Sequence, residues 1–229
     1  MSVKVPWLES EWEWNPVPSY LLGQLSKERP MSSNPWQIIE QLEADLCAYT
    51  GAPHAVCVAS GSAALLLCLE RFPPTLVSIP KRTYCSVPQE VLNAGHKINW
   101  IINDWRGEYQ LWPLPVWDSA RRMTSNMYRA GQMQCLSFAA TKILGVEQGG
   151  AILLDDAPVA SLLRKARYDG RTPGVDPHED ILSRGHHCPM LPSIAAQLVL
   201  QLHHLPRENE DLGAYPYPDQ SLQEVFKCS

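Results

Sequence analysis

Short apolar runs, separated by turn residues and amphipathic stretches, follow one another through the middle of the chain. The segment "NPWQIIEQLEADLCAYTG" spaces its apolar side chains at helical intervals and stops at Gly51, which predicts an amphipathic helix. Five short runs then fit buried strands: "HAVCVA", "TLVSIP", "INWIIND", "LPVWD" and "MQCLSF". Each leads into a turn or a helix-like stretch, so the pattern predicts an α/β fold of doubly wound character.

The pattern continues beyond these five runs. "GGAILLDD" predicts a further strand, "APVASLLRKARYDG" a helix that ends at Gly170, and "SIAAQLVLQLHHL" a strongly apolar helix after a Pro-, Gly- and His-rich loop. We therefore divide the chain into an N-terminal arm (1–34), an α/β domain (35–205) and a short C-terminal tail (206–229). The polar, proline-punctuated sequence of the tail predicts a loose segment.

Size and composition narrow the class of protein. The 229 residues suffice for one α/β domain with a substantial core, and the net charge of −5 gives no electrostatic reason to expect a nucleic-acid or membrane partner. Seven scattered cysteines without a CxxC pair are typical of buried thiols in a reducing compartment. We expect neither a signal peptide nor a membrane span, and hence a cytoplasmic protein.

The turn Ser60-Gly61-Ser62 joins a predicted strand to a predicted helix that begins at Ala63. Backbone N–H groups at a helix N-terminus, with a serine hydroxyl and a glycine that admits close approach, make a phosphate site. The same triplet also serves as an ordinary helix cap, and the turn alone leaves both interpretations open.

Two predicted strand ends carry further candidates. Asp118 ends the run "LPVWD", at the sheet edge where open α/β folds bind ligands, with a role as a helix cap as the alternative. Tyr84 follows the run "TLVSIP", where an aromatic side chain is either packing at the rim or a platform for a ligand.

Lys142 is the one cation between residues 136 and 156 and stands among small and apolar residues. A partly desolvated lysine has a lowered pKa, and its neutral amine forms a Schiff base with a carbonyl, whereas an ordinary lysine is a solvated surface charge. A phosphate-holding turn, a flat aromatic, a strand-end carboxylate and such an amine are what pyridoxal phosphate requires. Because each follows a different strand, we expect them to converge on one sheet edge.

Five stretches together resemble the DegT/StrS family of pyridoxal-phosphate-dependent sugar-nucleotide aminotransferases. They are "LEADLCAYTGAPHAVCVASGSAALLLCL", "VSIPKRTYCSVPQEVLNAG", "VWDSA", "SFAATKILGVEQGGAILLDD" and "LRKARYDGR". The resemblance runs from about residue 38 to about residue 205. It implies the large domain of the fold type I aminotransferases, a mostly parallel sheet flanked by helices, in an unusually short form with the C-terminal small domain largely missing.

The resemblance also implies roles for individual residues. Lys142 would form the Schiff base and later move the proton between carbon atoms, and Asp118 would pair with the pyridine nitrogen. Tyr84 would stack on the cofactor ring, and Arg121 stands where the family commonly has Gln or His near the phenolic oxygen. The implied phosphate ligands are Gly61, Ser62 and Ser137.

The implied reaction is the transfer of an amino group from an amino acid, usually glutamate, to a keto sugar linked to a nucleotide, catalysed by a homodimer. One alternative is a truncated protein that binds pyridoxal phosphate in a non-catalytic or regulatory role. Another is a different pyridoxal-phosphate reaction on a sugar, although the dehydratases of this family have histidine in place of the lysine. We assign His186 and His187 to a loop and predict no metal site.

Overall fold

The computed structural model describes residues 34, 36–176, 178–213 and 215–226. The predicted N-terminal arm, apart from Asn34, therefore lies outside the described residues. The account below concerns the compact unit that begins at Trp36.

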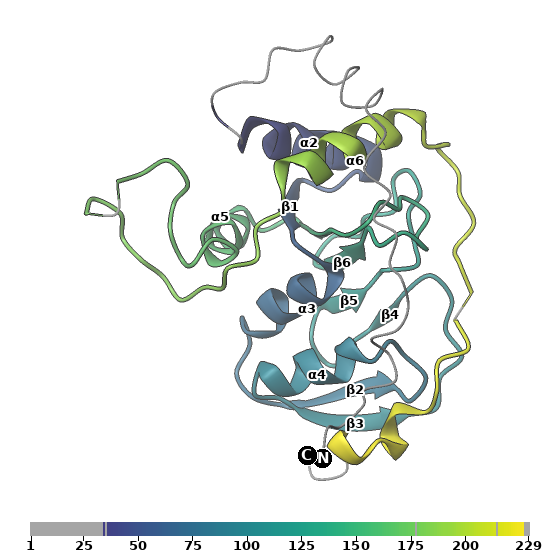
Figure 1. Ribbon diagram of the computed structural model, residues 1–229. Coiled ribbons are helices and arrows are strands. Elements are labelled where there is room, and N and C mark those ends of the chain that lie inside the picture. Colours follow the sequence, from purple (N-terminus) through teal and green to yellow (C-terminus); the bar gives the residue numbers. More distant parts are fainter. Residues whose placement is uncertain (1–33, 35, 177, 214, 227–229) are drawn as a thin grey trace, which may run out of the picture. The chain divides into compact units, whose positions relative to one another are not determined.

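A five-stranded mixed sheet forms the centre of this unit (Figure 1). Its strands are, in spatial order, β1 (His54–Val58), β7 (Gly150–Leu154), β6 (Met133–Ser137), β5 (Val116–Asp118) and β4 (Tyr109–Gln110). β5 and β6 are parallel, and β1 runs the same way because β7, between β1 and β6, is antiparallel to both. β4 is the antiparallel partner of β5, in a short hairpin.

A second sheet consists of the parallel strands β2 (Leu76–Pro80) and β3 (Lys97–Ile101), which are connected through α4 (Ser86–Asn93). The Ser78 N–H donates to the Trp112 carbonyl at 2.7 Å and joins this sheet to the segment between β4 and β5. The predicted α/β fold, with a sheet flanked by helices, is confirmed. The sequence predicted a mostly parallel sheet. β1, β5 and β6 run in one direction and β2 is parallel to β3, whereas β7 and β4 run antiparallel to their neighbours.

Helices cover both faces of the large sheet. On β1, Val56 and Val58 belong to the core that α3 (Gly61–Leu69) and α5 (Ala157–Ala166) cover, whereas Ala55 and Cys57 belong to the core under α2 (Trp36–Thr50) and α6 (Pro192–His204). A strand that is buried on both faces has no polar face to expose. The predicted strands therefore read as continuous apolar runs without alternation.

Residues 206–213 and 215–226, which we call the C-terminal strap, follow α6. The sequence suggested a loose tail, but this segment runs back past β4 to the β2–β3 sheet (Figure 1). The Asn209 side-chain amide donates to the Met123 carbonyl at 3.0 Å, and Asp211 pairs with Arg122 at 2.8 Å. At the far end Phe226 is buried, with its ring 5.9 Å from that of Trp100. The strap is thus bonded to the domain along its length.

The six cysteines within the described ranges are free thiols, and three of them, Cys57, Cys68 and Cys135, are buried. Burial raises the pKa of the Cys57 and Cys135 thiols well above the usual range, so both stay protonated and pack as small apolar groups. Among the described helices, none has the length and apolar character needed to cross a membrane.

A buried ion cluster joins α2 to α5 through β1. The Glu43 carboxylate, 5% exposed, accepts from Arg164 Nε at 3.0 Å, from Arg167 Nη1, and from the Cys57 N–H at 3.0 Å. The same two arginines donate to the carbonyls of Ala55 and Cys57. Glu43 and Arg167 are therefore paired away from water, and Arg164 joins them from a partly exposed position.

We expect Glu43→Ala to lower the free energy of unfolding by about 3 to 5 kcal/mol, because it leaves the Arg167 guanidinium buried without its counter-ion. Urea denaturation followed by circular dichroism measures the change. Glu40→Ala is the matched control, since Glu40 is exposed on the same helix. Equal midpoints for the two variants would show that the cluster does not stabilise the domain.

Candidate cofactor-binding site

The loop between β6 and β7 carries Lys142 and is closed by its own backbone. The Phe138 N–H donates to the Gly149 carbonyl at 2.9 Å, and the Val146 N–H donates back to the Phe138 carbonyl at 2.8 Å. Inside the loop, a Cβ added to Gly145 would lie 2.8 Å from the Lys142 carbonyl oxygen, so only glycine permits so tight a turn. Lys142 is therefore held on a constrained loop.

The N-terminus of α3 lies directly against this loop. A Cβ on Gly61 would lie 2.9 Å from the Ser137 Cβ, and one on Gly150 would lie 2.4 Å from the Ser60 carbonyl carbon. Ser60 caps the helix by accepting from the Ala63 N–H at 3.0 Å. The first turn of a helix carries N–H groups without intrahelical acceptors, and here they lie beside Ser137.

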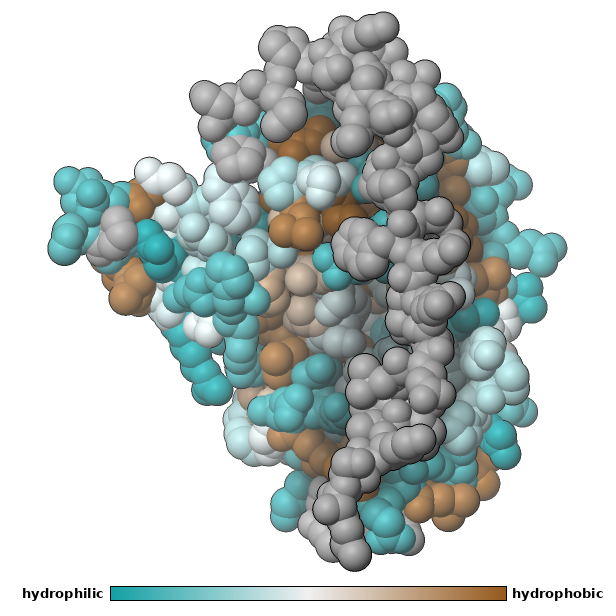
Figure 2. All heavy atoms as spheres, viewed as in Figure 1, coloured by the Kyte–Doolittle hydropathy of each residue, from teal (hydrophilic) through white to brown (hydrophobic). Residues whose placement is uncertain are grey.

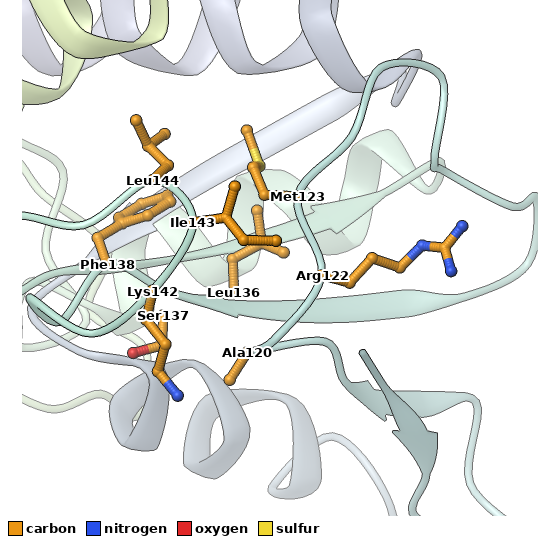
Figure 3. A pocket seen from close by; sticks show the side chains of 9 residues that line it. All are labelled: Ala120, Arg122, Met123, Leu136, Ser137, Phe138, Lys142, Ile143 and Leu144. Atoms are coloured by element: carbon orange, nitrogen blue, oxygen red, sulfur yellow. The ribbon is translucent and has the colours of Figure 1, made fainter. Parts of the chain in front are cut away.

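The Lys142 side chain is partly buried. Figure 3 shows it on the same side of the loop as the Ser137 hydroxyl, while Ile143 and Leu144 point the opposite way. A cavity of about 10 Å³, room for about one water molecule, adjoins these side chains. Burial lowers the pKa of the Lys142 amine, the Asp118 carboxylate opposes this by raising it, and the Arg121 guanidinium lowers it further.

Asp118, the last residue of β5, is 6% exposed. Its Oδ1 accepts from the Ala120 N–H at 3.0 Å and its Oδ2 from the Tyr109 hydroxyl at 2.9 Å. Because the Tyr109 proton is used in this way, the Thr83 hydroxyl, 2.5 Å from the Tyr109 oxygen, donates to it. Burial raises the pKa of Asp118, whereas the Ala120 N–H, the Tyr109 hydroxyl and the Lys142 charge favour the carboxylate.

Arg121 lies three residues beyond Asp118 and is held by the C-terminal strap. Its Nε donates to the Gly213 carbonyl at 2.6 Å, and its charge lowers the pKa of Tyr217, a residue of the strap. Burial raises the pKa of Tyr217, the Arg121 charge opposes this, and the Asp118 charge adds to it. Four titratable side chains, those of Lys142, Asp118, Arg121 and Tyr217, are therefore electrostatically linked.

Tyr84 and Ser62 lie at the edge of this group. The Tyr84 ring is 54% exposed and stands edge-on to Tyr217, with 6.1 Å between the ring centroids. The Ser62 hydroxyl donates to Ser86 at 2.6 Å and so links α3 to the start of α4, just beyond Tyr84. The ring of Tyr217 therefore connects Tyr84 to the charged group.

The structure brings most of the predicted residues together. Lys142, Asp118 and Arg121 are coupled by charge, and Ser137 contacts the turn at Gly61. Sequence reasoning missed two residues of the group, Tyr109 and Tyr217. The repeated tyrosines of "YPYPD" in the strap were a signal for Tyr217, whereas the two-residue strand that carries Tyr109 gave none.

The His186–His187 loop stands apart from the charged group. His186 Nε2 lies 2.9 Å from a Glu70 oxygen, and His187 Nδ1 lies 2.6 Å from an Asp169 oxygen. The pair formed by His187 and Asp169 is exposed to solvent. The loop is held by these two polar contacts.

Solved structures of sugar aminotransferases are similar in fold to this chain. A Streptococcus pneumoniae protein assigned as a sugar aminotransferase, in its PLP form, superposes with a TM-score of 0.62 at 18% identity, over 83% of this chain and 65% of that chain. The Helicobacter pylori aminotransferase of pseudoaminic acid biosynthesis gives 0.62 at 17%, over 82% and 62%. A sugar aminotransferase of Micromonospora echinospora gives 0.60 at 17%, over 81% and 66%. The chain thus spans 62 to 66% of the length of these solved chains.

A search among curated proteins found no match. The model of the DegT/DnrJ/EryC1/StrS aminotransferase family, in contrast, matches residues 31–102 and 121–220, about three quarters of the sequence. The match takes in the turn at Gly61, Tyr84 and the Lys142 loop, and it extends into the strap. The chain belongs to the DegT/DnrJ/EryC1/StrS aminotransferase family.

Proposed function

We propose that this protein is a pyridoxal-phosphate-dependent aminotransferase that acts through a Schiff base on Lys142. The observation that carries the proposal is the coupling of a partly buried lysine to a buried carboxylate at one sheet edge. Titratable groups whose pKa values are shifted by burial and by a specific charge partner are candidates for a functional site. The family and the PLP forms of similar structures support the choice of cofactor.

The residues present fit the cofactor. Gly61 lets the N-terminus of α3 approach Ser137, and Gly150 lets the cap residue Ser60 approach β7, each more closely than a side chain allows. Helix N–H groups and hydroxyls therefore come together for a phosphate. Asp118 is a buried carboxylate whose ionised form the neighbouring donors favour, and an ionised acceptor is what a protonated ring nitrogen requires. Lys142 is an amine of lowered pKa in the same group.

Bound pyridoxal phosphate supplies an aldehyde that condenses with amines and a ring that withdraws electrons. Lys142 would provide the condensing amine and, once released, would take up and return a proton. Asp118 would pair with the ring nitrogen and favour its protonated form, while Tyr84 would offer an aromatic face. Gly61, Ser62 and Ser137 would hold the phosphate, and Arg121 would be the donor for the phenolic oxygen.

The substrates follow from the family. We infer an amino-acid donor, glutamate by preference, and a keto-sugar acceptor that carries a nucleotide, with the protein working as a cytoplasmic homodimer. Sugar aminotransferases among the similar structures support the sugar, and the family supports amino transfer. A binding protein without catalysis is the second candidate, favoured by the 62 to 66% coverage of the solved chains.

We expect purified protein to take up pyridoxal phosphate and to develop the visible absorbance of a Schiff base, because Lys142 supplies the amine. Lys142→Ala should show no such band, whereas Lys165→Ala, which removes a lysine on α5, should behave as wild type. Absorbance spectra after gel filtration measure the difference. A wild-type protein that stays colourless would exclude the cofactor.

We expect glutamate to convert the visible band of the loaded protein to that of the aminated cofactor. Asp118→Ala should retain some cofactor but lose this conversion, because the ring nitrogen is no longer held protonated. Stopped-flow spectra give the rate. Stable colour in wild type with every amino donor would instead favour the binding-only candidate.

We expect capture of the cofactor by the cofactor-free protein to accelerate with rising pH, with a midpoint below that of a free lysine, since burial lowers the Lys142 pKa. Asp118→Asn should move the midpoint to lower pH because it removes a charge that stabilises the ammonium form. Arg121→Gln should move it to higher pH because it removes a repelling cation. Stopped-flow absorbance across pH measures both midpoints.

Glu147→Gln is the control for these two variants, because Glu147 is an exposed carboxylate on the Lys142 loop. Its midpoint should match wild type. Shifts of Asp118→Asn and Arg121→Gln in the same direction would contradict the charge coupling.

A further inference from the structure

The C-terminal strap is bonded to the loops that carry the candidate cofactor residues. The Leu212 N–H donates to the Arg121 carbonyl at 3.0 Å, next to Asp118, and the Gly107 N–H donates to the Leu212 carbonyl at 3.0 Å. Farther along, the Gln220 N–H donates to the Lys81 carbonyl at 2.9 Å. The strap therefore spans from the end of β5 to the end of β2.

Gln220 fixes the strap next to the predicted aromatic platform. It is 4% exposed, and its side-chain amide donates to the Thr83 carbonyl at 3.2 Å. Thr83 precedes Tyr84 in the chain and also bonds to Tyr109, the partner of Asp118. A buried amide that anchors this turn from the strap ties the position of Tyr84 to that of the strap.

Tyr217 lies between these anchor points and is where the strap meets the charged group. The Arg121 charge lowers the pKa of its hydroxyl and the Asp118 charge raises it, so the side chain lies within electrostatic reach of both. Its ring stands edge-on to Tyr84 at 6.1 Å, an arrangement that aromatic pairs favour. One side chain thus contacts the aromatic that the proposed function places at the cofactor and interacts electrostatically with the cation.

Arg121 is bound by the strap at two points. Its Nε donates to the Gly213 carbonyl at 2.6 Å, and its own carbonyl accepts from the Leu212 N–H at 3.0 Å. An arginine side chain has many rotamers, and the bond to Gly213 restricts them. The strap therefore orients the Arg121 guanidinium, whose charge lowers the pKa of Lys142.

We propose that the C-terminal strap forms the outer wall of the cofactor site and that Tyr217 is the positioning residue through which it acts. The wall orients Arg121 and Tyr84 toward the cofactor and keeps water from it. This proposal rests on the proposed function, because it takes pyridoxal phosphate as the occupant of the site.

Tyr215 provides a matched comparison on the same strap. Its ring lies 5.2 Å from that of Tyr217 but is 59% exposed, and its hydroxyl has no hydrogen-bond partner among the residues that the structure describes. Tyr215→Phe and Tyr217→Phe each remove one hydroxyl and keep the ring. Only Tyr217→Phe removes a hydroxyl that interacts electrostatically with Arg121 and Asp118.

The experiment titrates cofactor-free wild type, Tyr217→Phe, Tyr217→Ala and Tyr215→Phe with pyridoxal phosphate and then quenches the bound cofactor's fluorescence with iodide. We expect the Kd of Tyr217→Phe to rise roughly two- to tenfold, the usual effect of removing one polar group that interacts with a charge. Tyr217→Ala should show a larger rise and stronger quenching, because the ring is lost as well. Tyr215→Phe should match wild type in both measurements.

Three outcomes overturn the proposal, and they differ in what else they exclude. Wild-type Kd and quenching in Tyr217→Ala would show that the strap is not part of the wall, while the proposed function stands. Tighter binding by Tyr217→Ala would show that the strap competes with the cofactor for the site. A wild type that captures no cofactor through Lys142 would overturn the wall and the proposed function together.

Discussion

The close approach of α3 to the ends of β6 and β7 is the constraint on which the whole candidate site depends. The Ser60 backbone lies where a Cβ on Gly150 would be, at 2.4 Å, and the Ser137 side chain lies 2.9 Å from where a Gly61 Cβ would be. Two glycines therefore let a helix N-terminus reach the loop that carries Lys142. Because the two strand ends share this edge, the donors for an anion and the reactive amine come together there.

The charges beside this edge balance one another. Burial favours the neutral forms of Lys142 and Asp118, whereas each charge favours the ionised form of the other. Arg121 shifts the balance at Lys142 toward the free amine, while the Tyr109 hydroxyl favours the ionised form of Asp118 by donating to it. Tyr109 thus opposes part of the effect of burial at Asp118, whereas Arg121 adds to that effect at Lys142.

The local elements were predictable because strands buried on both faces leave long apolar runs, and the runs for β1, β6 and β7 are unbroken by charge. The direction of the strands could not be predicted, because β7 buries the same residues whether it runs parallel or antiparallel to its neighbours. The two-residue β4 is too short for any period, so Tyr109 was missed. Tyr217 was missed because its segment has no periodic pattern. The strap is held by contacts with residues far away in the sequence, such as the bond from Asn209 to Tyr49 and the ring contact between Phe226 and Trp100. The local sequence does not encode such contacts.

The family match is interrupted from residue 103 to residue 120, and this gap contains both Asp118 and Tyr109. The assignment of Asp118 therefore stands on its position in the fold. β5 runs parallel to β6, so both strands end at one edge of the sheet. The Asp118 charge raises the pKa of Lys142, which lies in the loop that follows β6. The β4–β5 hairpin sets Tyr109 opposite Asp118 in register, which supplies the buried carboxylate with its donor from the next strand. A short hairpin is thus sufficient to present a supported carboxylate at the site.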